Sequence, residues 1–286
     1  MKRISTLVMF MAVALNAASQ QNWDSIQVTS HHVKDNIYML KGSGGNIGVL
    51  TGKDGIVMID DQFIELSTKI KDAIAALDKG PIRFTLNTHI HGDHSGSNEY
   101  FKQLGSTIVA HEMVRERMIQ EPRKEDAWPV ITFPEKLSLH LNGQDIDLIH
   151  FEPAHTDGDV IIHFKQSNVF HMGDLFVRYG YPYIDVSSGG SINGMIACVE
   201  KALMLMNDES LIIPGHGELC KKDEVKKFRD RLAEIRDKVA TALKQGKKPE
   251  DLAALGITNA YEAEWGKGFI KGKDFVLIVA AGLEKK

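Results

Sequence analysis

A dense group of metal-binding side chains lies in the stretch NTHIHGDHSGSN, residues 87–98. Within six positions it holds three histidines and one aspartate: His89, His91, Asp93 and His94. Imidazole nitrogens with few carboxylates suit zinc best, although iron and manganese accept similar ligands. The stretch therefore predicts a site for one metal ion, or for two ions that divide the four ligands between them.

The spacing of these residues argues against a regular helix or strand as their support. In a helix, residues two positions apart face nearly opposite ways, and in a strand Asp93 and His94 would point to opposite faces. We therefore expect a loop folded around its ligand, in which Gly92 supplies backbone freedom. The preceding run IRFTLNTH predicts a buried strand that leads into this loop.

Three more candidate ligands each follow an apolar run that predicts a strand. His155 lies in EPAHTDGD, Asp174 in HMGDLF, and His216 between two glycines in IIPGHGE. Loops that leave strand ends gather over a sheet, where binding sites are commonly built. We expect these three residues to complete the site begun by residues 89–94.

Strand-like and helical segments alternate along the rest of the chain. The early runs NIYMLKG, GGNIGVLTG and DGIVMIDD predict a meander with Gly-rich turns. Apolar residues at helical spacing predict helices at 65–77, 98–105, 112–120, 189–206 and 221–246. Residues 120–134 predict a long loop, and five more strands are expected between 136 and 217. Strand blocks alternating with helices in each half predict an α+β fold with two sheets and helices outside them.

The N-terminus predicts export. Residues 1–19 begin with Lys2 and Arg3, continue with an apolar run and end in small residues, which is the layout of a secretory signal peptide. The apolar run is too short for a membrane-spanning helix. Because no cysteine lies at its end, a lipid anchor is not expected. We expect residues 20–286 to form one domain in the periplasm or outside the cell, without a stable membrane anchor.

Charge and cysteine content narrow the remaining classes. A net charge of −4 over 286 residues gives no basic surface for nucleic acid. An oxidising compartment would permit a disulfide between the two cysteines, Cys198 and Cys220. Cys198 also fits the apolar face of a helix, so a buried free thiol is an equal alternative.

The order HxHxDH, then His, Asp and a His in a GHG turn, resembles the metallo-β-lactamase superfamily of hydrolases. The resemblance implies a four-layer αββα sandwich with a two-metal site between the sheets at one edge. It assigns His89, His91 and His155 to the first metal ion and Asp93, His94 and His216 to the second. Asp174 would bridge both ions, as in glyoxalase-II-like members.

This resemblance also implies the chemistry. Two Zn²⁺ ions per chain, with Fe or Mn as alternatives, would share a water and lower its pKa, so that a metal-bound hydroxide attacks the substrate. Asp93 would orient that hydroxide and pass a proton on, which makes it the candidate catalytic residue. The expected reaction is hydrolysis of an ester, lactone, thioester or amide bond in a small molecule.

Alternative activities within the family depend on Asp174. Zinc β-lactamases usually carry Cys or Ser at the bridging position, so weak β-lactamase activity is expected rather than a dedicated enzyme, although export favours the latter. Persulfide-dioxygenase-like members hold a single iron, which His89, His155 and Asp174 would bind here. Glyoxalase II binds glutathione through basic residues, and no motif for them follows GDLFV.

Several neighbouring segments have an open role. Tyr179, Tyr181 and Tyr183 follow the Asp174 strand and either line the pocket or pack on the sheet edge. Residues 42–46, GSGGN, precede no predicted helix and therefore do not form a phosphate loop. They predict a hairpin tip, which in this family can close over the substrate. For His171, three positions before Asp174, ordinary packing is expected ahead of the alternative, a contact that supports a metal ligand.

Overall fold

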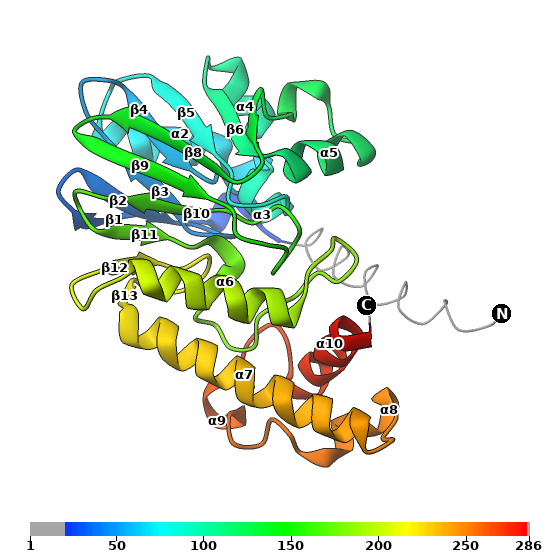
Figure 1. Cartoon of the computed structure of the whole chain (residues 1–286). Coiled ribbons are helices and arrows are strands. Elements are labelled where there is room, and N and C mark those ends of the chain that lie inside the picture. The colour runs from blue at the N-terminus through cyan, green and yellow to red at the C-terminus, as the bar shows by residue number, and fades with distance from the viewer. Residues whose placement is uncertain (1–20, 285–286) are drawn as a thin grey trace.

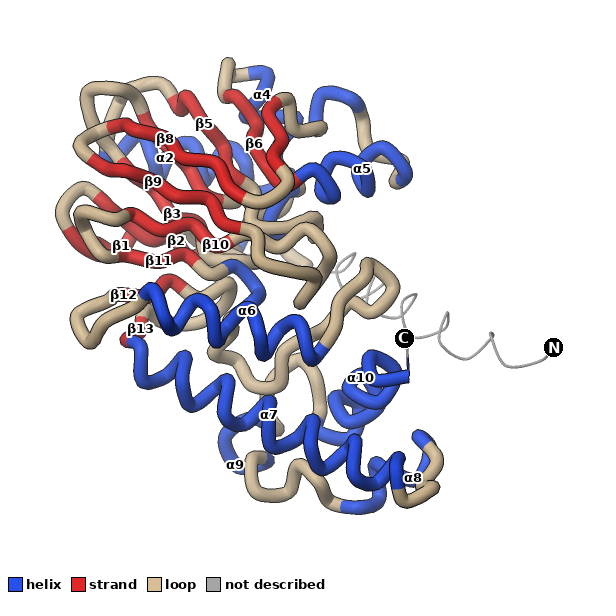
Figure 2. The backbone as a smooth tube through the Cα atoms, viewed as in Figure 1, coloured by secondary structure: helices blue, strands red, loops and turns tan. Residues whose placement is uncertain are grey.

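Two β-sheets packed face to face, with helices on both outer faces, make up the chain (Figure 1). The structure is a computed structural model that describes residues 21–284; the expected signal peptide, residues 1–19, lies outside the described residues. The α+β prediction and its four-layer αββα order are confirmed (Figure 2).

The first sheet contains seven strands in sequence order. They are β1 (Thr29–Lys34), β2 (Ile37–Lys41), β3 (Ile47–Leu50), β4 (Ile56–Ile59), β5 (Ile82–Leu86), β6 (Thr107–His111) and β7 (Ile131–Phe133). Neighbouring strands from β1 to β4 pair antiparallel, and those from β4 to β7 pair parallel. The parallel strands place the residues that follow β4, β5 and β6 at one edge of the sheet.

The second sheet follows the first along the chain. Its order is β13 (Cys220–Lys221), β12 (Leu211–Ile213), β11 (Val169–His171), β10 (Ile161–Phe164), β9 (Gln144–Ile149) and β8 (Lys136–Leu141). Strands β11 and β12 pair parallel, with His171 opposite Ile213. Their C-terminal ends therefore lie side by side, and Asp174 and His216 follow from them.

Helices cover the two outer faces. The first sheet is covered by α2 (Ser67–Leu77) and α4 (Asn98–Gln103), whose apolar residues pack on those of β2, β3 and β4. The second sheet is covered by α6 (Ile192–Leu205) and α7 (Lys222–Lys244). The helix α5 (Glu112–Gln120) follows β6. Side chains of both sheets, among them Leu50 and Leu148, fill the space between them.

The C-terminal part of the chain extends the layer outside the second sheet. It contains α8 (Pro249–Leu252), α9 (Glu262–Trp265) and α10 (Gly272–Glu284), and α10 contacts both α6 and α7 (Figure 1). Within residues 21–284, no helix combines the length and the hydropathy needed to cross a membrane.

Most expected elements are present with shifted ends, and two expectations are wrong. Residues 131–133, inside the predicted loop, form β7 because their backbone continues the first sheet beside β6. The loop expected around residues 89–94 contains one helical turn, α3 (Gly92–Ser95). One helical turn can still present Asp93 and His94 to the same site, because adjacent residues of a short helix can both face a ligand beside it.

Candidate metal centre

The first group of candidate ligands is His89, His91 and His155. One ring nitrogen of each lies within 4.8 Å of the others. His91 Nδ1 is 2.9 Å from His155 Nε2. His89 and His155 are almost fully buried, and His91 is partly exposed. The structure therefore brings the loop after β5 and the loop between β9 and β10 together, as the sequence predicts.

A second group contains Asp93, His94 and His216. Their ligand atoms also lie within 4.8 Å of one another. His216 Nε2 is 3.2 Å from Asp93 Oδ2 and 3.3 Å from His94 Nε2. The turn after β12 thus meets α3, although the two are far apart in sequence.

Asp174 lies between the two groups. Its Oδ1 is 3.2 Å from His94 Nε2 and 3.4 Å from His216 Nε2, whereas its Oδ2 is 3.7 Å from His155 Nε2. The two carboxylate oxygens therefore face different groups. Gly215 permits this approach, because a Cβ at that position would overlap Asp174 Oδ1.

The donor set fits metal ions. Among the described side chains, His89 Nε2 and Asp174 Oδ1 are buried atoms without a hydrogen-bond partner. Asp174 Oδ1 approaches two imidazole nitrogens but forms a well-directed hydrogen bond with neither. A buried polar atom without a partner costs roughly 1–3 kcal/mol. Both atoms face the centre of the site, where a cation would satisfy them.

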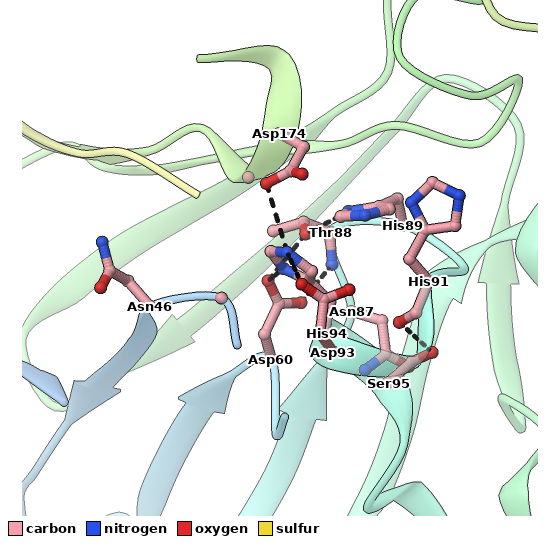
Figure 3. A network of polar contacts seen from close by, with 12 residues as sticks. Asn46, Asp60, Asn87, Thr88, His89, His91, Asp93, His94, Ser95 and Asp174 are labelled. Atoms are coloured by element: carbon pink, nitrogen blue, oxygen red, sulfur yellow. Dashed lines mark hydrogen bonds and ion pairs between the residues drawn. The ribbon is translucent and has the colours of Figure 1, made fainter. Parts of the chain in front are cut away.

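One buried carboxylate orients a histidine from each group (Figure 3). His94 Nδ1 lies 2.7 Å from Asp60 Oδ2, which also accepts a 2.7 Å hydrogen bond from Thr88 Oγ1. His89 Nδ1 is in turn 3.0 Å from Thr88 Oγ1. These contacts occupy Nδ1 of both rings and leave Nε2 for a metal, the usual arrangement for a histidine ligand.

The outer contacts of the first group come from one segment of the chain. His91 Nε2 lies 3.2 Å from Asp185 Oδ2, and His155 Nδ1 donates to the carbonyl of Tyr183 at 2.7 Å. Sequence reasoning missed both Asp60 and Asp185. Asp60 had a usable signal, an acidic residue directly after a buried strand, while nothing in the sequence singles out Asp185.

The electrostatics differ between the two groups. Burial lowers the pKa of His89, and it lowers that of His155 to about 4, so both rings are neutral and ready to bind a metal. Burial alone would also lower the pKa of His216, but Asp174 and Asp93 raise it to about 9. Burial would raise the pKa of Asp93, yet His94 and His216 lower it to about 2.

The three tyrosines divide between the site and the core. The Tyr179 ring lies 5.4 Å from that of His216, and the Tyr183 ring lies 6.0 Å from that of His91. Tyr181 instead stacks on Phe275 and donates a hydrogen bond to Glu262. Tyr181 therefore packs in the core, as one interpretation of the sequence predicts, while Tyr179 and Tyr183 lie beside two histidines of the metal centre.

The structure also describes the two cysteines, the hairpin tip at residues 42–46 and His171. Cys198 and Cys220 are buried free thiols, so the disulfide alternative is wrong. Residues 42–46 form the β2–β3 hairpin tip, but Gly45 and Asn46 are buried against the site, which fixes the base of the tip. His171 donates from Nε2 to the carbonyl of Asn46 at 3.0 Å, so it does more than fill space.

Comparison with known proteins identifies the family of the chain. Residues 40–216 match the family model described as metallo-beta-lactamase superfamily. A metallo-beta-lactamase type 2 of Bacillus cereus is 20% identical over 60% of this chain and 66% of its own length. A hydroxyacylglutathione hydrolase of Polaromonas sp. is 29% identical over 50% and 52%, respectively. The chain thus matches between about half and two thirds of the length of these two relatives.

Two solved structures have the same fold. A metallo-beta-lactamase from Pontibacter korlensis superposes with a TM-score of 0.65 at 16% identity, covering 72% of this chain and 99% of its own. The DIM-1 metallo-beta-lactamase gives a TM-score of 0.63 at 15% identity, over 72% and 97%. The family match spans more than half of the sequence, and the chain therefore belongs to the metallo-β-lactamase superfamily.

Proposed function

We propose that the chain is an exported hydrolase that binds two zinc ions and cleaves an ester, lactone, thioester or amide bond in a small molecule. One observation carries this proposal: Asp174 lies between two groups of three ligands and turns one carboxylate oxygen to each. A carboxylate in that position suits a pair of ions better than a single ion.

The ligand assignment follows the two groups. His89, His91 and His155 would hold the first ion, Asp93, His94 and His216 the second, and Asp174 both. When bound, such a pair supplies an acidified water as nucleophile at neutral pH and polarises the bond that is cleaved.

The protein side chains orient the reactants. Asp93 is ionised at neutral pH and its side chain is 27% exposed, so its carboxylate can accept a hydrogen bond from a water and pass a proton towards solvent. Tyr179 and Tyr183 stay protonated because burial raises their pKa values. Their hydroxyl groups are candidates to donate hydrogen bonds to a substrate beside His216 and His91.

A dedicated β-lactamase is the second candidate. The match to a metallo-beta-lactamase type 2 of Bacillus cereus supports this candidate. The aspartate at position 174 argues for a broader or different substrate, with β-lactam hydrolysis as a weak side activity. Relative turnover of a β-lactam and a lactone by one sample separates the two candidates.

The decisive measurement combines elemental analysis with turnover assays on the purified protein. We expect about two zinc ions per chain, together with hydrolysis of a lactone or nitrocefin. Asp174→Ala should lower metal affinity by at least the roughly 10–100-fold loss seen for outer-shell substitutions. His140→Ala is the control, since His140 is exposed and pairs with Asp145 away from the centre.

Two outcomes would contradict the two-zinc proposal. An unchanged Asp174→Ala enzyme would exclude the bridging role. About one iron per chain, with oxygen uptake on a persulfide and no hydrolysis, would favour the dioxygenase alternative with His89, His155 and Asp174 as ligands. The 2.9 Å approach of His91 Nδ1 to His155 Nε2 supports the three-histidine group instead.

Export is the part of the proposal that rests on residues 1–19. A basic start, an apolar run and a small-residue end support cleavage near Ala17–Ser19 and release into the periplasm. The intact mass of protein from a periplasmic extract should correspond to a chain that begins near residue 20. A full-length mass, or protein confined to the cytoplasm, would contradict export.

A further inference from the structure

We propose that Asn46 is a positioning residue for His216 and thereby sets the affinity of the second metal ion. The inference rests on the proposed function, because it concerns how the chain holds one of the two ions. Asn46 lies at the base of the β2–β3 hairpin tip, and the turn that it contacts begins at Pro214, 168 positions later.

The backbone and side chain of Asn46 together hold the turn around His216. Its Nδ2 donates to the carbonyl oxygens of Pro214 and Gly217, each at 2.9 Å, and its backbone N–H donates to that of Gly215 at 2.6 Å. Three carbonyl groups that flank His216 are thus fixed by one residue. Asn46 itself is only 3% exposed, and His171 donates to its carbonyl.

The preceding glycine contacts the other two residues of the second group. The Gly45 N–H donates to the carbonyl of Asp93 at 3.0 Å, and a Cβ at Gly45 would overlap the His94 ring. Residues 45 and 46 therefore touch the segments of all three second-group ligands. In Figure 3 Asn46 lies on the side of Asp60 and Asp174, away from His91, whose outer contact is Asp185.

The turn needs this support because of its own sequence. Pro214-Gly-His-Gly217 places His216 between two glycines, and Gly217 has a φ of +104°. Glycine backbones lose more conformational freedom on ordering than any other residue. Without the Asn46 amide, the carbonyl groups of Pro214 and Gly217 lose their fixed hydrogen bonds. The turn keeps the backbone hydrogen bonds of Gly215 and His216 with residues 173–178, but the position of His216 relative to Asp93 and His94 is less closely defined.

Zinc titration against a competing chromophoric chelator tests the inference. Asn46→Ala, and Asn46→Asp as a variant of the same shape without the amide donors, should bind one of the two ions roughly 10–100-fold more weakly, the loss typical of outer-shell contacts. Asn36→Ala is the matched control. Its Nδ2 also donates to a backbone carbonyl, that of Thr51, at the opposite end of β2 and β3.

Two ligand-deficient backgrounds identify which ion is affected. In His91→Ala the second group remains intact, and adding Asn46→Ala should weaken the remaining ion by the same 10–100-fold. In His216→Ala the first group remains intact, and adding Asn46→Ala should leave its affinity unchanged. A general loosening of the fold would weaken the ion in both backgrounds.

The possible results separate the inference from the proposed function. Equal losses in both backgrounds, or no loss in either, would overturn the role of Asn46. Fewer than two ions in the unmodified protein would overturn the two-zinc proposal, while the His91→Ala series still tests Asn46. If neither Asn46→Ala nor Asn46→Asp folds, as judged by circular dichroism, Asn46→Ser retains one hydroxyl donor and should show an intermediate loss; wild-type affinity would count against the inference.

Discussion

At the scale of single residues, the centre is organised by pairs of a ligand and its outer contact. Asp60 serves His94 directly and His89 through Thr88, while Asp185 serves His91. The ligands could be predicted because histidines and aspartates at strand ends share a visible pattern. Among their outer contacts Asp60 had a sequence signal, directly after a buried strand, but Asp185 had none, because a single buried acid of this kind acquires its role only when distant loops meet.

Another buried acid predicts a pH dependence of stability. Burial raises the pKa of Asp159 to about 7, although Thr156 donates two hydrogen bonds to it. The folded chain therefore keeps a proton on Asp159 between its ordinary pKa of 3.8 and about pH 7, whereas the unfolded chain releases it. Since the folded state binds more protons in this window, its stability should fall as the pH rises through it.

Urea unfolding of the wild type and Asp159→Asn, both treated with chelator, checks this expectation. The difference in free energy of unfolding between the two should change by a few kcal/mol at most between about pH 4 and pH 7, at about 1.4 kcal/mol per pKa unit. Above pH 7 the difference should be constant. A difference that is flat from pH 4 to pH 7 would mean that Asp159 is ionised in the folded protein.

At the scale of elements, prediction worked where one periodicity dominates a long segment. The charged helix expected at 221–246 is α7, with Val225, Phe228 and Leu232 on its buried face. Prediction failed where tertiary contacts decide the local structure. Strand β7 exists because β6 offers it a pairing edge, and the contacts of Asn46 with residues 214–217 join segments that are far apart in the sequence.

The two cysteines give an element-scale prediction. Cys198 lies in α6 and Cys220 in β13, and burial raises the pKa of each thiol to about 12. Because the thiolate is the reactive form, neither should react with a thiol reagent at pH 8 in the folded protein. Both thiols should react in denaturant without a reductant. In Cys220→Ser, one thiol per chain should react under the same conditions.

Reagent uptake by the native protein would show that one of the two elements opens. The absence of thiols in denaturant would show that the cysteines are oxidised, contrary to their state in this structure. Intact mass before and after alkylation gives the same count independently.

At the scale of the whole molecule, the sequence predicted the two-sheet sandwich but not the C-terminal helices that extend its outer layer. The order of motifs and strands predicted two sheets with external helices. Helix α10, whose Phe275, Val276 and Val279 are buried, was not anticipated, since its long apolar run shows no clear helical face. Its place beside α6 and α7 depends on contacts that no local pattern encodes.

The order of strands has a consequence for how the two halves of the chain are linked. The first sheet uses residues 29–133 and the second residues 136–221, so the described strands are joined across the sandwich by one short connection after Phe133. Each ligand group nevertheless draws two residues from the first half and one from the second. Bound ions would therefore link the two halves of the chain a second time. The chain between the linked residues would then form a closed loop with less conformational entropy. The supply of metal ions would then decide whether the two sheets are linked by that connection alone or by a metal site as well.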